Sequence, residues 1–139
     1  MRHSVVTVIK RPHLLLAGAI AALVLIASFE AGAGGTTLQS GVFTGLSKHV
    51  TTGGVSVVRT DEGVTVVMAE DFSLDGAPDP KVGFGHNGVY DSEAQLGHLA
   101  SKSGAQTYVV PASVEVERYN EIYIWCDQFS VPLGVAKLR

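Results

Sequence analysis

Short runs of β-branched residues, divided by turn-forming residues, constrain the fold of this chain more than any other feature. Residues 55–58 and 64–68 are two such runs, and Asp61-Glu62-Gly63 between them has the composition of a hairpin turn. Turn residues recur at intervals of about ten residues, which predicts roughly seven or eight short strands. We therefore expect an all-β domain, built as an antiparallel β-sandwich or a barrel-like sheet.

The other expected elements are less regular. A second pair of strands is predicted at 106–110 and 122–126, and a short strand hemmed in by glycine at 82–84. Residues 129–138 also have the composition of an extended segment. After Gly34, only residues 92–99 have a pattern that can form one or two turns of helix.

The first 33 residues have the layout of an export segment. The basic residues Arg2, Lys10 and Arg11 precede the uncharged run Leu14–Phe29. As a helix this run would extend about 24 Å, which is shorter than the roughly 30 Å of a bilayer core. The small residues 31–33 match the A-x-A pattern of a cleavage site, so we expect a signal peptide cut after Ala33.

An uncleaved membrane anchor is the alternative to cleavage, because Glu30 lies close to the proposed site. Both interpretations place the residues after Gly34 outside the cytoplasm, since basic residues that precede an apolar run stay inside. The expected organisation is a signal peptide or anchor at 1–33, a linker at 34–40 and a folded domain at 41–139. That domain would be periplasmic or extracellular, and either secreted or held by one N-terminal transmembrane helix.

The charge balance argues against nucleic acid as a partner. The chain has 10 Lys and Arg and 13 Asp and Glu, of which three basic residues and one acidic residue fall within 1–33. The remainder therefore carries 7 basic and 12 acidic residues, a balance of −5. Phosphate binding needs clustered Lys and Arg, and this part of the sequence lacks such clusters.

Two local patterns imitate ligand sites. Gly83–Gly88 satisfies G-x-G-x-x-G, but no helical pattern follows, so we interpret it as a glycine-rich turn between two strands. Asp71, Asp75 and Asp79 are four residues apart and lack the alternate spacing of a calcium-binding EF-hand loop. We expect these carboxylates to accept hydrogen bonds from turn backbone.

A series of short motifs runs in a fixed order from residue 41 to the end of the sequence. The motifs are Gly41-Val42-Phe43, Asp71-Phe72, Gly76-Ala77-Pro78-Asp79, Leu96-Gly97-His98-Leu99, Gly104–Pro111, Tyr119, Ile122–Cys126, Phe129-Ser130-Val131 and Gly134–Leu138. In this order they resemble the DM13 domain. Ala77, within what is usually a Gly-Pro-Asp run, and Pro132 in the tail are departures from its pattern.

The resemblance implies a β-sandwich module on the outer side of the membrane with one near-invariant cysteine, here Cys126. In animals such domains occur beside DOMON and cytochrome b561 domains, and that company prompted the proposal of electron transfer or redox chemistry. The resemblance therefore marks Cys126 as a suspected redox residue. It identifies no cofactor and no electron donor, acceptor or envelope partner, so these stay unknown.

Cys126 falls on the aliphatic face of its predicted strand. Alternation places Ile122, Ile124 and Cys126 on one face and Tyr123 and Trp125 on the other. If this thiol is buried, it is chemically inert and serves only as packing. An unpaired thiol kept in an oxidising compartment instead suits a redox relay, cofactor ligation or transient disulfide exchange. The sequence leaves these roles open.

No metal site is predicted around this cysteine. Blue-copper sites have His and then Met shortly after the cysteine, and neither follows Cys126. The candidate imidazole ligands of the domain, His49, His86 and His98, all lie far upstream, so a metal site of His and Cys could form only if folding brought them together. Attachment of haem through C-x-x-C-H is excluded, because the chain has a single cysteine.

Four aromatic residues come from neighbouring predicted strands, so they can gather on one face: Tyr108, Tyr119, Tyr123 and Trp125. We expect most of them in the core or at its rim. A platform for a sugar or a small aromatic ligand is the alternative, because flat rings give a large contact area at low entropic cost.

Two functions from different classes follow from the sequence. The first is an exported DM13-type domain with a redox or electron-transfer role centred on Cys126. The alternative is a non-enzymatic binding or scaffold module of the cell envelope, in which this cysteine is only packed and the aromatic side chains bind. The sequence contains no H-E-x-x-H or G-x-S-x-G motif that would indicate a hydrolase.

Overall fold

The structure, a computed structural model, describes residues 34–139. This part of the chain consists of ten strands and one 3₁₀ turn. The strands are β1 (Thr36–Gly45), β2 (Thr51–Thr52), β3 (Gly54–Thr60), β4 (Gly63–Met68), β5 (Ser73–Leu74), β6 (Pro80–His86), β7 (Val89–His98), β8 (Gln106–Val109), β9 (Glu121–Cys126) and β10 (Val131–Lys137), and the 3₁₀ turn is η1 (Val116–Arg118). Within residues 34–139 we find no helix with the length and apolarity needed to cross a membrane.

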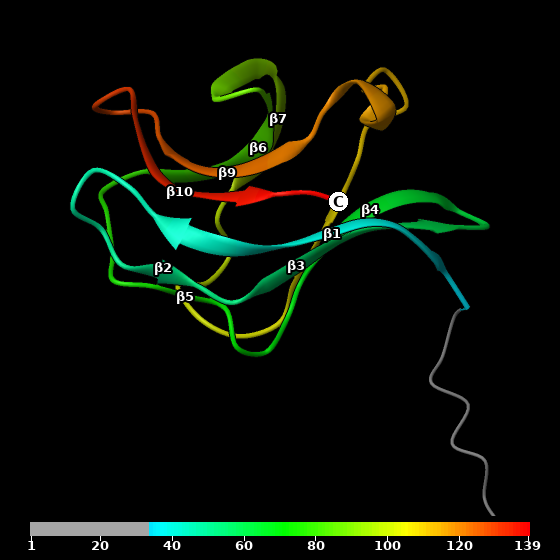
Figure 1. Cartoon of the computed structure of the whole chain (residues 1–139), viewed down its shortest axis with the longest axis horizontal. Coiled ribbons are helices and arrows are strands. Elements are labelled where there is room, and N and C mark those ends of the chain that lie inside the picture. Colours follow the sequence, from blue (N-terminus) through cyan, green and yellow to red (C-terminus); the bar gives the residue numbers. More distant parts are fainter. Residues whose placement is uncertain (1–33) are drawn as a thin grey trace, which may run out of the picture. The chain divides into compact units, whose positions relative to one another are not determined.

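Eight of the strands form one antiparallel sheet in the order β7-β6-β9-β10-β1-β3-β4-β8. The sheet curves round, so that β6 and β9 lie on one side of the core and β3 and β4 on the other (Figure 1). The short strands β2 and β5 pair separately. The predicted all-β, antiparallel and barrel-like architecture is confirmed.

The predicted hairpin is confirmed as β3 and β4, which pair from Val55↔Met68 to Thr60↔Gly63. Gly63 has a φ of 135°, a conformation that suits glycine. Two other predictions are wrong. Segment 106–110 does not pair with 122–126, because β8 pairs with β4 while β9 lies between β6 and β10. Residues 92–99 are not helical, since most of them belong to β7, which pairs with β6.

The chain enters the sheet earlier than expected. β1 begins at Thr36, so most of the segment 34–40, predicted as a linker, is strand that pairs with β3. Pairs such as Thr36↔Arg59 and Gly41↔Val55 supply the backbone hydrogen bonds that make this segment extended. The predicted export segment, 1–33, lies outside the described residues.

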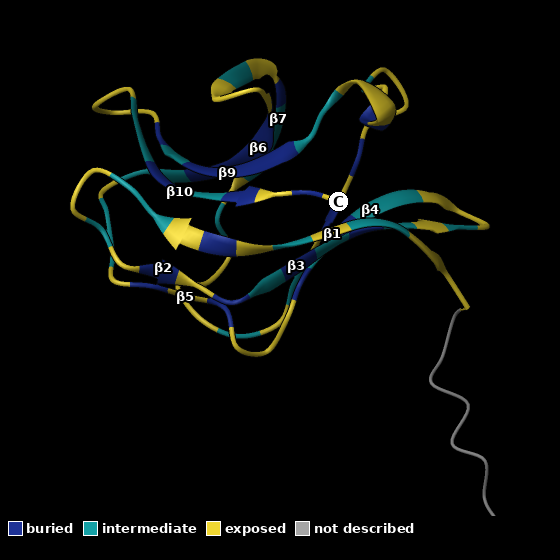
Figure 2. Ribbon diagram, viewed as in Figure 1, coloured by how far each residue is buried: buried dark blue, intermediate teal, exposed yellow. Residues whose placement is uncertain are grey.

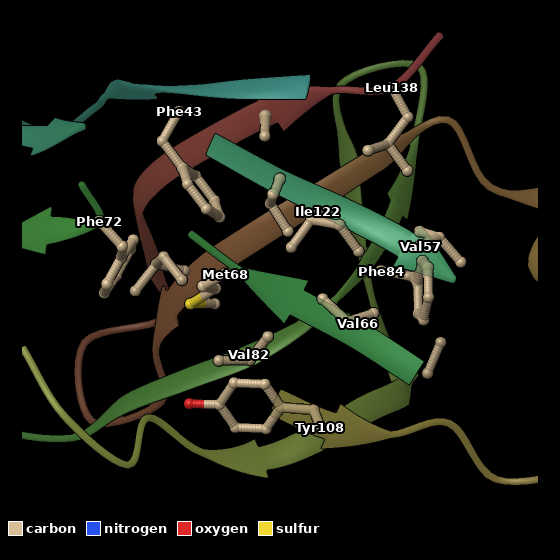
Figure 3. Packing of buried hydrophobic residues seen from close by; sticks show 14 of the residues in the cluster. Phe43, Val57, Val66, Met68, Phe72, Val82, Phe84, Tyr108, Ile122 and Leu138 are labelled. Carbon is tan, nitrogen blue, oxygen red and sulfur yellow. The ribbon is translucent and has the colours of Figure 1, made fainter. Parts of the chain in front are cut away.

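Apolar side chains from both sides of the curved sheet fill the interior. Buried positions concentrate in β6 and β9, drawn dark blue in Figure 2. Figure 3 shows side chains from opposite sides of the sheet meeting in this core, among them Val66, Met68, Val82 and Ile122. Each such side chain contributes roughly 1.5–3 kcal/mol through burial, so this packing stabilises the curved sheet.

Candidate functional site

The two faces of β9 have different chemistry. Ile122, Ile124 and Cys126 point into the core, and the exposed fraction of Cys126 is 1%. Tyr123 and Trp125 point the other way, outward from the core cluster. The structure thus places the thiol and the indole of neighbouring residues on opposite sides of one strand.

Tyr123 and Trp125 form an aromatic cluster with Tyr90 of β7. The rings of Tyr90 and Trp125 are stacked, with centroids 4.4 Å apart and an interplanar angle of 10°. Tyr90 also meets Tyr123 edge to face at 5.8 Å. We call Tyr90, Tyr123 and Trp125 the outer aromatic cluster. Tyr123 is 4% exposed, whereas Tyr90 and Trp125 are half-buried, so solvent reaches the cluster at the stacked pair.

Two glycines of β6 make room for these rings. A Cβ atom at Gly83 would lie 2.8 Å from Cε2 of Tyr90, and one at Gly85 would overlap the ring of Tyr123. Asn87 and Gly88 follow with φ values of 51° and 86° and turn the chain into β7. Gly83 and Gly85 thus lie within β6, where their lack of a side chain leaves space for the aromatic rings. Only Asn87 and Gly88 form a turn, so the interpretation of the whole G-x-G-x-x-G pattern as a turn between strands is right for its last two residues and wrong for the others.

The hydroxyl of Tyr123 meets a buried carboxylate. Tyr123 Oη donates a hydrogen bond to Glu121 Oε2 at 3.2 Å, and Gly88 N donates to the same oxygen at 2.8 Å. Glu121 is only 5% exposed. Burial, together with the charge and hydrogen bond of Glu121, raises the pKa of Tyr123 to about 12. The phenol of Tyr123 therefore keeps its proton throughout the neutral range.

The stacked pair has a polar rim on the same outer face. Gln95 Nε2 donates to Tyr90 Oη at 3.0 Å and lies 3.3 Å from both carboxylate oxygens of Asp127. Burial is the main cause that raises the pKa of Tyr90. Lys81, which pairs with Trp125 across the strands, has its Nζ 3.0 Å from Asp79 and 4.0 Å from Asp127. The ammonium group of Lys81 is thus balanced by two carboxylates.

The other two predicted aromatic residues lie elsewhere. Tyr108 of β8 belongs to the core cluster. Its hydroxyl donates a hydrogen bond to Gln106 Oε1 and accepts one from Ala100 N. Tyr119 packs on Phe84 with ring centroids 5.3 Å apart. The structure therefore brings together Tyr123 and Trp125 but neither Tyr108 nor Tyr119. Tyr108 belongs to β8, the edge strand at the other end of the sheet from β7, and Tyr119 precedes β9 and packs on Phe84 instead.

The candidate metal ligands are also dispersed. His49 Nδ1 bonds Asp75, His86 Nε2 bonds Asn87, and both ring nitrogens of His98 lie 2.9 Å from Lys81 Nζ. Over the range 34–139, no group of three or more His, Cys, Asp and Glu side chains is placed to hold a metal ion.

Two of the three spaced aspartates accept backbone hydrogen bonds, although not, as was expected, from their own turns. Asp71 accepts from Gly54 N at 2.9 Å and Asp75 from Val50 N at 3.0 Å. Their partners are distant in sequence rather than local, so these carboxylates join separate segments. The side chain of Asp79 instead pairs with Lys81.

Sequence reasoning missed Tyr90 and Glu121. A signal for Tyr90 exists: Gly83 and Gly85 alternate on one face of a strand and are followed by an Asn-Gly turn, which leaves space for rings of the next strand. Glu121 gave no such signal, because a single acidic residue at the start of a strand is ordinarily exposed.

The fold and the site define a small all-β domain with one buried thiol and an aromatic cluster on the opposite face of the same strand. A family model described as "Electron transfer DM13" matches residues 43–138. The chain therefore belongs to the DM13 family of electron-transfer domains. No curated protein and no solved structure matches the chain.

Proposed function

We propose that this protein is an electron-transfer module that acts outside the cytoplasm, with Cys126 as its redox residue and the stacked Trp125–Tyr90 pair as its surface contact. Membership of the DM13 family over residues 43–138 supports electron transfer. The basic residues ahead of the apolar run Leu14–Phe29 support export.

One observation carries this proposal. Trp125 stacks on Tyr90 at 4.4 Å, is half-buried, and is the immediate chain neighbour of Cys126. Electron transfer slows steeply with the distance between groups, so rings in van der Waals contact form an efficient path. One peptide unit separates the indole from the residue that carries the thiol.

The burial of Cys126 fits a group that exchanges electrons without touching its partner. At 1% exposure the thiol is shielded from other thiols and from peroxide, which would convert it to a disulfide or a higher oxide in an oxidising compartment. Disulfide exchange requires an accessible thiolate, so this geometry supports electron transfer over exchange.

The same burial favours the second candidate function, a binding or scaffold module of the envelope. A thiol among aliphatic side chains such as Ile122 and Ile124 also serves as plain packing. In that case the outer aromatic cluster would be the binding surface, since half-buried rings present a flat apolar contact.

The experiment compares the purified full chain with its C126A and W125F variants. An absorption spectrum of the parent first reveals any bound haem, flavin or metal–thiolate centre. Titration with one-electron mediators then measures whether the protein gives up an electron and regains it reversibly. We expect the response of the parent to be lost in C126A and slowed in W125F. A C126A variant with the redox response and spectrum of the parent would overturn the role of Cys126.

A further inference from the structure

One ring of the outer aromatic cluster has a built-in proton acceptor. The Oη of Tyr123 donates to Glu121 Oε2 at 3.2 Å, and both residues are 5% exposed or less. The second hydrogen bond to Oε2, from Gly88 N at 2.8 Å, fixes this oxygen in place. The phenol and the carboxylate therefore meet in a region from which bulk water is largely excluded.

A phenol gives up an electron readily only when its proton leaves at the same time, because the phenol radical cation is a very strong acid. The group that takes the proton must already lie in hydrogen-bond contact. The raised pKa of Tyr123 agrees with this arrangement, since the reduced phenol keeps its proton at neutral pH. The proton then moves only when the ring is oxidised.

Tyr123 is connected to the surface by the other two rings. Tyr90 touches both, stacked on Trp125 at 4.4 Å and edge to face with Tyr123 at 5.8 Å. Trp125 and Tyr90 are half-buried, whereas Tyr123 is 4% exposed. An oxidant in solution thus reaches Tyr123 through the stacked pair.

We propose that Tyr123 is a proton-coupled electron-transfer residue, with Glu121 as its proton acceptor and Trp125 and Tyr90 as the path to the surface. This inference rests on the electron-transfer function proposed above and assigns that function a second redox group, distinct from Cys126.

The electrons and protons balance as follows. A high-potential one-electron oxidant, the metal centre of a partner protein, takes one electron from Trp125. The Trp125 radical cation recovers an electron from Tyr123 by way of the Tyr90 ring. The Tyr123 O–H bond breaks and its proton passes to Glu121 Oε2, which leaves a neutral tyrosyl radical and a carboxylic acid. Reduction returns one electron to Tyr123 and the proton from Glu121.

Neighbouring tyrosines lack one part of this arrangement. Tyr90 Oη accepts a hydrogen bond from Gln95 Nε2, and among residues 34–139 no carboxylate accepts one from it, so Tyr90 bridges without holding the radical. Tyr119 does donate to a carboxylate, Asp91, at 2.7 Å. Its ring packs on Phe84, which is far harder to oxidise. Tyr119 is therefore a matched control: a tyrosine–carboxylate pair without the aromatic path.

The test photo-oxidises the purified full chain with a ruthenium(III) polypyridyl complex generated by a light flash. Electron paramagnetic resonance identifies the radical, and transient absorption gives its rate of formation. In the parent we expect a tyrosyl radical that forms more slowly in D₂O and at a rate independent of buffer concentration. Y123F should lose this signal and accumulate a tryptophan radical, whereas Y119F should behave as the parent.

E121Q keeps the size of the side chain and an oxygen acceptor but removes the base. We expect radical formation on the order of a hundredfold slower, and dependent on buffer base, because the positioned proton acceptor is gone. Near-UV circular dichroism of each variant verifies that the cluster is intact. An E121Q variant with the rate of the parent, or a Y123F variant that keeps the tyrosyl signal, would overturn the proposal.

C126A separates this inference from the proposed function. The photochemical oxidant replaces the partner protein, and the path from Trp125 to Glu121 does not include the thiol. We expect C126A to keep the tyrosyl radical at the parental rate even where it loses the reversible redox response. Loss of the radical in a folded C126A protein would contradict the assignment of the radical to Tyr123.

Discussion

The side chain of Cys126 lies among aliphatic groups, and this environment determines how its replacement acts. Ser in place of Cys puts a hydroxyl on the face shared with Ile122 and Ile124, where desolvation costs roughly 1–3 kcal/mol if no partner is found. Ala leaves a small cavity that costs about 1 kcal/mol. We therefore expect C126S to be less stable than C126A in urea unfolding.

Native thiol labelling gives an independent check of this environment. At 1% exposure, the thiol of Cys126 should react with a neutral thiol reagent only as the protein unfolds. Fast labelling of the folded protein, or a Ser variant as stable as the parent, would show that the side chain is more accessible than its packing indicates.

Tyr123 makes the protein sensitive to alkali. Its pKa is 10.0 in the unfolded chain and about 12 in the folded protein. The folded state therefore holds a proton that the unfolded state has lost, so stability is fully present below pH 10 and falls as pH rises toward 12. The melting temperature of Y123F should therefore fall less steeply with pH over this interval than that of the parent. An identical pH profile for Y123F and the parent would contradict the shifted pKa.

Sequence alternation was sufficient to place single residues of β9 on the correct faces, with Cys126 inside and Trp125 outside. It could not identify the partner of Trp125. The stack depends on Tyr90, which comes from another strand and fits only because Gly83 has no side chain. Such a contact depends on tertiary register, which no local pattern specifies.

At the scale of elements, β6 and β7 decide whether the outer aromatic cluster can form. We expect G85A to displace the ring of Tyr123, because a Cβ there has no free space. The expected result is a loss of about 1–3 kcal/mol in stability, as for overpacking, with an altered near-UV spectrum.

The matched control for this substitution is G54A, in β3. A Cβ at Gly54 would meet Ala69 Cβ at 3.5 Å, an ordinary contact, and the backbone there does not have a positive φ. G54A should therefore keep the near-UV spectrum and most of the stability of the parent. Equal effects of G85A and G54A would show that glycine in a strand, rather than space for the ring, explains the loss.

β7 shows why an element can be misassigned from its own residues. Residues 92–96 include Glu93, Ala94 and Gln95, which favour helix by intrinsic propensity. Pairing with β6 overrides that preference, and the register shifts between Gly83↔Gln95 and Gly85↔Tyr90. The shift gives β7 extra residues opposite one β6 position, so it bends over the outer face. Tertiary pairing, unlike propensity, is invisible in a short window.

At the scale of the whole molecule, the sheet joins the two ends of the domain. β1 pairs with β10 on one side and with β3 on the other, from Phe43↔Ala136 to Gly45↔Gly134 along β10. The sheet order was not predictable from the sequence, because turn signals identify hairpins and not the long-range pair β1–β10. The sheet is continuous only when β10 lies between β9 and β1.

Export is a prediction about the whole chain. It rests on the basic residues that lie before the apolar run and not after it. Arg2, Lys10 and Arg11 precede Leu14–Phe29, which should leave residue 139 outside the cytoplasm. We expect activity from a reporter enzyme that functions only outside the cytoplasm when it is fused after Arg139. Removal of residues 1–33 should abolish that activity, and replacement of the three basic residues by Glu should reduce it. A full-length fusion active only with a cytoplasmic reporter would place the aromatic cluster and Cys126 in a reducing compartment, where the proposed extracytoplasmic electron transfer does not operate.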